Sequence, residues 1–187
     1  LMLIIYDFIS YTDVFTYNIT TLESLLIYAM KTITYQSDYL GNGFEFATIN
    51  QPDDYEGKVV ATVIRKQCSM PSNKAVLYVH GFNDYFFQSD MAHRFNEKEY
   101  HFYAIDLRKY GRSTLPHHKS NNMRSLTEYF ADLDEALDII RQEGNEQVLL
   151  SGHSTGGVLV TLYASERVGN EKFDTIFCNS PLYDMNM

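Results

Sequence analysis

A serine flanked by glycines is the feature of this sequence best placed to do chemistry. The run is Gly152-His153-Ser154-Thr155-Gly156, and it directly follows the apolar residues 148–150 and opens a helical pattern. A G-x-S-x-G run between a strand and a helix is typical of a tight turn that exposes the serine hydroxyl, because glycines leave room for nearby backbone. The helix N-terminus behind the serine favours developing negative charge. We therefore predict that Ser154 is a nucleophile, against the alternative of a glycine-rich turn without chemistry.

Backbone N–H groups near the serine are the second requirement, since an attacked carbonyl group develops a negative oxygen. Where a serine occupies such a turn, one N–H comes from the next residue, here Thr155, and another from the loop after an earlier strand. That loop begins His80-Gly81-Phe82, and Phe82 is the predicted second donor. For the His80 side chain, a structural hydrogen bond at the strand end is favoured over a role as general base.

A charged block, Asp106-Leu107-Arg108-Lys109-Tyr110-Gly111-Arg112-Ser113, follows the next apolar strand. We expect Asp106 and Arg108 to pair with each other or to brace this loop near the site rather than to react. His117 and His118 follow in a loop, but two adjacent histidines without other ligand types nearby are a weak metal pattern. The sequence therefore predicts no metal and no other cofactor.

Alternating strands and helices must position these residues. The predicted strands are 44–48, 59–64, 75–79, 102–105, 147–150 and 175–178, and the predicted helices are 85–95, 125–142 and 155–168. Residues 51–54 and 71–73 are predicted turns, and Ser125 and Glu128 form a predicted capping box. Residues 1–40 are interpreted as an N-terminal extension, with helical spacing from Leu22 to Ala29. Buried strands alternating with amphipathic helices predict a mostly parallel α/β sheet covered on both faces, entered by antiparallel strands.

Three of these motifs together resemble the α/β-hydrolase superfamily: His80-Gly81, the 106–113 block and Gly152–Gly156 occur in its order and spacing. The 106–113 block resembles the monoacylglycerol-lipase and lysophospholipase-like branch, also called the serine aminopeptidase family. The resemblance covers about residues 40–183, so 41–187 is interpreted as the N-terminal part of a catalytic domain. One departure is Lys109-Tyr110, where that family commonly has Gly-His, and we expect it to change the shape of the loop.

The resemblance implies a serine hydrolase that acts on carboxylic esters, lipid-like ones such as monoacylglycerols or lysophospholipids, through an acyl-enzyme at Ser154. The serine argues against dehalogenase and epoxide-hydrolase chemistry, in which relatives of this fold use Asp. The family order is serine, acid, histidine, and no histidine follows Ser154. We therefore expect the acid, the histidine, the lid and the last strands beyond Met187. The alternative is a non-catalytic, hydrolase-like binding protein.

Composition restricts the partners. Lys and Arg number 15 against 24 Asp and Glu, a formal net charge of −9, which disfavours nucleic acid and anionic membranes. The apolar run of residues 1–6 is too short to span a bilayer.

The two cysteines, Cys68 and Cys178, have neither metal nor disulfide spacing, and Cys178 is predicted to be a core thiol in a cytoplasmic protein. A sheet without its last strands predicts an exposed apolar edge, which a homo-oligomer would cover.

Overall fold

The computed structural model describes residues 33–167, 169 and 172–183 of the 187-residue chain. The expected helix between Leu22 and Ala29 lies outside the described residues. The domain boundary near residue 40 stays a prediction. The segment just before it does join the fold, because β1 (Gln36–Ser37) pairs with β2 and Asp38 is buried.

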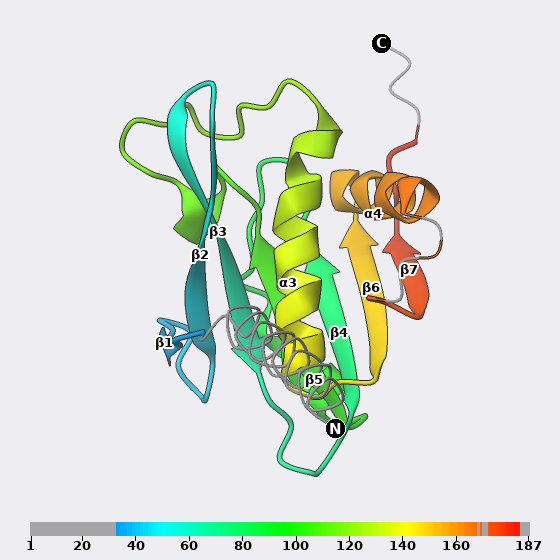
Figure 1. Ribbon diagram of the computed structural model, residues 1–187. Coiled ribbons are helices and arrows are strands. Elements are labelled where there is room, and N and C mark those ends of the chain that lie inside the picture. Colours follow the sequence, from blue (N-terminus) through cyan, green and yellow to red (C-terminus); the bar gives the residue numbers. More distant parts are fainter. Residues whose placement is uncertain (1–32, 168, 170–171, 184–187) are drawn as a thin grey trace, which may run out of the picture. The chain divides into compact units, whose positions relative to one another are not determined.

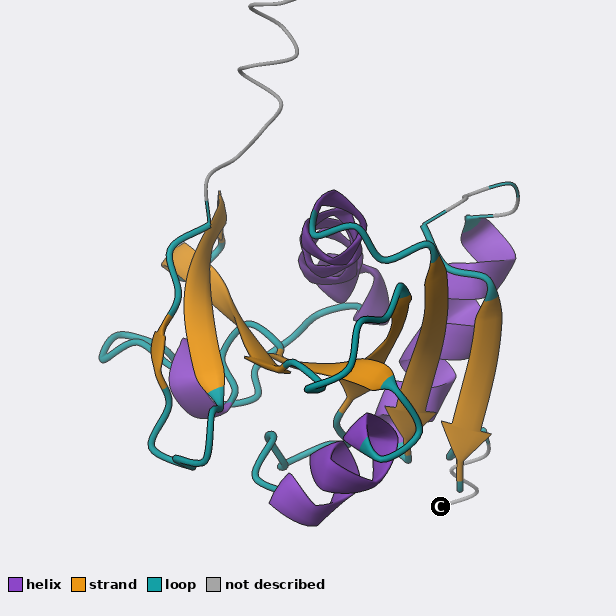
Figure 2. Cartoon of the chain, turned by 90° about the horizontal axis from the view of Figure 1, so that it is seen from below, coloured by secondary structure: helices purple, strands orange, loops and turns teal. Residues whose placement is uncertain are grey.

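The described residues form a seven-stranded mixed sheet with helices on both sides (Figures 1 and 2). The strands are β1, β2 (Glu45–Asp54), β3 (Gly57–Lys66), β4 (Lys74–Val79), β5 (Tyr100–Asp106), β6 (Gln147–His153) and β7 (Thr175–Asn179), and their spatial order is β1-β2-β3-β5-β4-β6-β7. The first three are antiparallel, β3 is antiparallel to β5, and the other neighbours are parallel. The α/β-hydrolase fold with its antiparallel entry is thus confirmed.

The helices are α2 (Ser89–Asn96), α3 (Phe130–Gln142) and α4 (Thr155–Glu166), with short 3-10 turns η1 (Gly111–Ser113) and η2 (Leu126–Tyr129). The Ser125 and Glu128 capping box is present at the start of η2. α3 and α4 lie on one face of the sheet (Figure 1), and α3 buries Phe130, Leu133, Leu137 and Ile140 as its spacing predicted.

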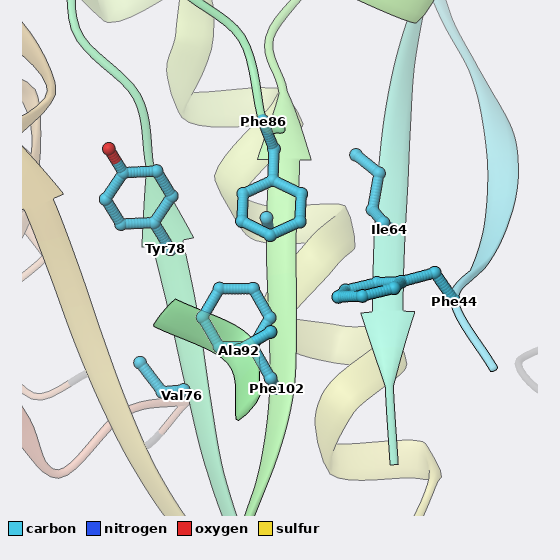
Figure 3. Close-up of a cluster of buried hydrophobic side chains, with 8 residues drawn as sticks. Phe44, Ile64, Val76, Tyr78, Phe86, Ala92 and Phe102 are labelled. Atoms are coloured by element: carbon cyan, nitrogen blue, oxygen red, sulfur yellow. The ribbon is translucent and has the colours of Figure 1, made fainter. Parts of the chain in front are cut away.

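The opposite face is packed by an aromatic cluster under α2. It consists of Phe44, Ile64, Val76, Tyr78, Phe86, Ala92, Phe102 and Ala104, seven of which are labelled in Figure 3. Apart from Phe86 and Ala92, these side chains come from or flank four strands, β2 to β5, so the cluster joins the antiparallel strands to the parallel ones. Burying aromatic side chains contributes several kcal/mol in total, because about 25 cal/mol is gained for each Å² of apolar surface removed from water.

Two predicted boundaries were wrong for tertiary reasons. The helix expected from Tyr85 begins only at Ser89, because the Phe86 N–H donates to the Asp106 carboxylate at 2.8 Å while the Phe86 ring enters the core. The turn expected at 51–54 lies at 55–56 instead. β2 continues as far as Asp54, and its pairing with β3 is interrupted by a bulge between Gln51 and Asp54 that contains Pro52. A proline fits at such an irregular position because it has no N–H to lose from the ladder.

At the other edge of the described sheet, β7 is exposed. Ile176 and Phe177 leave 39% and 56% of their surface accessible. Cys178 is only half-buried, so the prediction of a core thiol was wrong, because this strand has a neighbour on one side alone among the described strands. The exposed apolar residues agree with the expected edge, whereas the homo-oligomer stays a prediction.

Candidate active site at the carboxyl ends of the strands

Ser154 lies where β6 ends and α4 begins. Its backbone angles are φ 53° and ψ −120°, a conformation that costs energy for a residue with a Cβ. The turn is held by the next strand, because the Ser154 N–H donates to the Asn179 carbonyl at 3.1 Å and the Ser154 carbonyl accepts from Leu182 at 3.3 Å. Ser154 is half-buried and directly precedes the first turn of α4.

Glycines make this turn possible because backbone occupies the space of their side chains. A Cβ at Gly152 would lie 2.4 Å from the Gly156 carbonyl oxygen, and one at Gly156 would lie 2.3 Å from the His80 carbonyl oxygen. A Cβ at Gly81 would lie 3.2 Å from the Ser154 Cβ. The loop after β4 therefore lies directly against the serine turn, as the spacing of the motifs predicted.

The two residues predicted to supply N–H donors line one narrow pocket. Phe82 and Thr155 both line it, with His80, Gly81 and Gly156 beside them. The Thr155 N–H opens α4, and the first N–H groups of a helix have no partner within the helix. Two backbone donors at these positions would suit an oxygen that becomes negative during attack.

The remaining wall of this pocket is apolar and was not predicted. It is formed by Leu107, Tyr110, Leu126, Tyr129 and Leu159. The Tyr110 ring packs against the His80 ring, with centroids 4.7 Å apart. The only signal in the sequence was the unusual Lys109-Tyr110 pair, because Tyr110 stands where the family commonly has a histidine.

His80 joins two strand ends through both ring nitrogens. Its Nδ1 lies 2.8 Å from the Gly81 carbonyl, to which it donates, and its Nε2 accepts the Leu107 N–H at 3.2 Å. Burial lowers the pKa of this imidazole, which keeps it neutral. The geometry thus favours the structural role expected for His80 over that of a general base.

Asp106 and Arg108 brace the loop, but not through each other. The buried Asp106 accepts the Phe86 N–H and both the N–H and guanidinium of Arg112, which also pairs with Asp38 at 2.7 Å. Arg108 instead pairs with the buried Asp132 at 2.7 Å. Sequence reasoning missed these acids, because no local pattern connects partners that lie 74 and 24 residues away.

The other histidines of this region contact backbone carbonyl groups. His117 and His118 both place Nε2 near the Lys58 carbonyl, at 3.0 and 2.9 Å, and His153 contacts the Asn179 carbonyl at 3.1 Å. Among residues 33–167, 169 and 172–183, no group of three or more His, Cys, Asp or Glu is arranged to hold a metal ion. Over the same residues, no helix is long and apolar enough to cross a membrane.

Residues 70–187 match the family model described as serine aminopeptidase, S33. The chain belongs to this family of α/β hydrolases. The expected family is therefore confirmed, together with its fold.

Curated relatives and solved structures add to this assignment. Epoxide hydrolase 4 from Mus musculus is 33% identical over 89 residues, 48% of this chain and 23% of the relative; its Homo sapiens counterpart is 32% identical over the same length. The chain thus spans about a quarter of the length of these curated relatives.

Among solved structures, a probable hydrolytic enzyme from Pseudomonas aeruginosa PAO1 aligns with a TM-score of 0.60 and 15% identity, covering 82% of this chain and 45% of that one. A carboxyl esterase from Bacillus coagulans aligns with a TM-score of 0.60 and 18% identity, covering 71% and 43%. At these identities the structures show the shared fold alone.

Proposed function

We propose that this chain carries the nucleophile and oxyanion-binding parts of a serine esterase, which forms an acyl-enzyme at Ser154. The observation that carries the proposal is the strained, half-buried Ser154 at the start of α4, beside a pocket lined by both Phe82 and Thr155. A hydroxyl nucleophile suits attack on an ester carbonyl: the serine oxygen adds to the carbonyl carbon and gives an oxyanion, and collapse of that intermediate breaks the bond to the leaving group, which departs as an alcohol that carries the proton lost by the serine. The names of the curated relatives suggest epoxide hydrolysis instead, but Ser154 at the turn favours acyl transfer.

A lipid-like ester is the proposed substrate class, supported by apolar side chains around the turn. Phe82 is 59% exposed, and Leu182, whose N–H donates to the Ser154 carbonyl, is 44% exposed. Exposed apolar residues grouped beside a reactive residue mark a surface that binds apolar ligands.

Labelling with a fluorophosphonate probe tests the proposal. Labelling of the 187-residue chain that is lost in the Ser154→Ala variant would show that Ser154 reacts. The contacts of the described histidines run to backbone carbonyl and N–H groups and not to the serine hydroxyl. A Ser154→Cys variant is therefore tested in parallel with p-nitrophenyl butyrate. A thiolate needs no neighbouring base above about pH 8.5.

The native chain and the Ser154→Cys variant together distinguish a working site from an inactive one. Labelling of Ser154, or acylation of the introduced thiol faster than that of a free thiol of equal pKa, supports the site. If the serine is unlabelled and the introduced thiol is no faster than the free thiol, the proposal is wrong and a hydrolase-like binding protein is the better description.

A further inference from the structure

Three residues other than glycine adopt left-handed backbone angles in the two loops beside the serine turn. They are Asn83 (φ 54°), Lys109 (φ 66°) and Asn121 (φ 58°). Asparagine tolerates this region, whereas a lysine pays about 1 kcal/mol for it. Residues in such conformations persist only where surrounding contacts hold them. The contacts that hold these three residues connect them to one another.

Asn121 joins the two loops. Its backbone N–H donates to the Lys109 carbonyl at 3.1 Å, and its side-chain Nδ2 donates to the Asn83 Oδ1 at 3.0 Å. Asn83 directly follows Phe82, whose N–H is the proposed oxyanion donor. Asn121 is therefore bonded through its backbone to Lys109 and through its side chain to Asn83, the neighbour of Phe82.

Lys109 anchors this connection to the tip of the β2–β3 hairpin. Its ammonium is fully buried and lies 2.6 Å from the Asp54 carboxylate and 2.9 Å from that of Glu56. It also lies 4.2 Å from the centroid of the Tyr55 ring. A buried ammonium between two carboxylates and a ring face has little freedom, so the backbone of Lys109 is fixed with it.

A second set of contacts ties the same segment to the hairpin tip. The Asn122 side chain donates to the Glu56 carboxylate at 2.8 Å, and the Tyr55 hydroxyl donates to the Asn122 carbonyl at 3.2 Å. The hairpin tip thus holds Asn122 beside Asn121, and it also holds Lys109, whose carbonyl accepts the Asn121 N–H. The Asn121 side chain that donates to Asn83 is therefore held in place by its own backbone.

Phe82 needs such support because little else holds it. Phe82 is 59% exposed, and among the described residues its N–H finds no backbone acceptor. Its neighbour Gly81 lies so close to the serine that a Cβ there would be 3.2 Å from the Ser154 Cβ. A small movement of residues 81–83 would therefore change the distance between donor and nucleophile.

We infer that Lys109, Asn121 and Asn83 form a strut from the hairpin tip that positions the Phe82 N–H for the oxyanion. The inference rests on the proposed function of Ser154 and Phe82, and these three residues are positioning residues that do not touch the substrate. It also explains why a lysine replaces the glycine that is common in this family at position 109.

The test compares two reactions of one thiol, in a Ser154→Cys chain that also carries Cys68→Ser and Cys178→Ser. Acylation by p-nitrophenyl butyrate develops an oxyanion, whereas alkylation by iodoacetamide does not. Asn121→Gly and Asn83→Gly each remove the bond and keep the left-handed backbone accessible. The matched control is Asn42→Gly, another left-handed asparagine (φ 49°) in the turn before β2, at the opposite end of the sheet.

We expect Asn121→Gly and Asn83→Gly each to slow acylation about fivefold, since one hydrogen bond contributes about 1 kcal/mol, and to leave alkylation unchanged. The double variant should lose no more than either single variant, because both remove the same bond. Asn42→Gly should alter neither rate.

Three results would overturn the strut: unchanged acylation in both single variants, equal slowing of both reactions, or multiplied losses in the double variant. Failure of the proposed function itself looks different. In that case the introduced thiol at position 154 is acylated no faster than a free thiol in any of the chains, including the one that keeps both asparagines.

Discussion

The serine turn (residues 152–157) and the loop after β5 (residues 107–122) are fixed by opposite means. In the serine turn, side chains are excluded at Gly152 and Gly156, where backbone from the end of β4 and from α4 occupies the space that a Cβ would need. In the loop, long charged side chains reach buried carboxylates, as Arg108 reaches Asp132. The serine turn thus depends on close backbone contact, whereas the loop around it depends on charge pairs that span the fold.

Removal of a buried carboxylate should have the largest effect on stability. Asp132→Ala leaves the guanidinium of Arg108 buried without its partner, and we expect the free energy of unfolding to fall by about 4 kcal/mol in urea denaturation. The control is Glu97→Ala, which breaks the exposed Arg94–Glu97 pair (3.3 Å) and should cost less than about 0.5 kcal/mol. Similar losses in both variants would show that the loop does not depend on its buried pair.

A methyl group in the serine turn should have the next largest effect. The Cβ of Gly156→Ala would lie 2.3 Å from the His80 carbonyl oxygen and 2.5 Å from that of Val79, so the helix must shift, at a cost of about 3 kcal/mol. Gly41→Ala is the control, because its Cβ meets nothing within 4 Å and only its φ of +65° is strained, at about 1 kcal/mol. Urea denaturation measures both variants, and equal losses would contradict the role assigned to backbone contact.

The smallest effect concerns the pH dependence of the loop. Although burial raises the pKa of Asp54, the ammonium of Lys109 outweighs it and holds that pKa below its ordinary value, and the same ammonium lowers the pKa of Glu56. A carboxyl with a lowered folded pKa stabilises the fold above its unfolded pKa, here 3.8 and 4.5, and loses that contribution as the pH falls through the folded pKa. The advantage of the native chain over Lys109→Met should therefore be full at pH 7 and narrow below about pH 4.

Urea midpoints at several pH values measure this difference. Lys98→Met, at an exposed lysine, is the control, and the difference between its urea midpoint and that of the native chain should not change with pH. If the difference in urea midpoint between Lys109→Met and the native chain is equally constant, the carboxylates of Asp54 and Glu56 are not coupled to the lysine.

The same contrast explains what could be predicted from the sequence. The serine turn was predictable, because its requirement for glycine is local and Gly152 and Gly156 stand on either side of Ser154. The six longer strands and α3 were predictable from their apolar patterns, and the capping box before η2 was predictable from the spacing of Ser125 and Glu128. The partners of Arg108 and Arg112 were not, because Asp132 and Asp38 become neighbours only after the chain folds.

The ends of helices and strands that depend on tertiary contacts also could not be predicted from the sequence. The late start of α2 follows from the bond between the Phe86 N–H and Asp106, and the long β2 follows from a bulge. The burial of Lys109 contradicted its residue type, since a lysine in a loop is normally exposed. Its only sequence signal was a departure from the glycine that is common in the family.

The left-handed backbone of Ser154 has a consequence for protein engineering. A redesign that optimised stability alone would place glycine at this position, since glycine accepts φ 53° without strain. The most stable version of this fold would therefore lack the hydroxyl. That a serine occupies a position better suited to glycine indicates that the chain has been selected for something other than stability, and the same mismatch between residue and backbone can be sought in other folds.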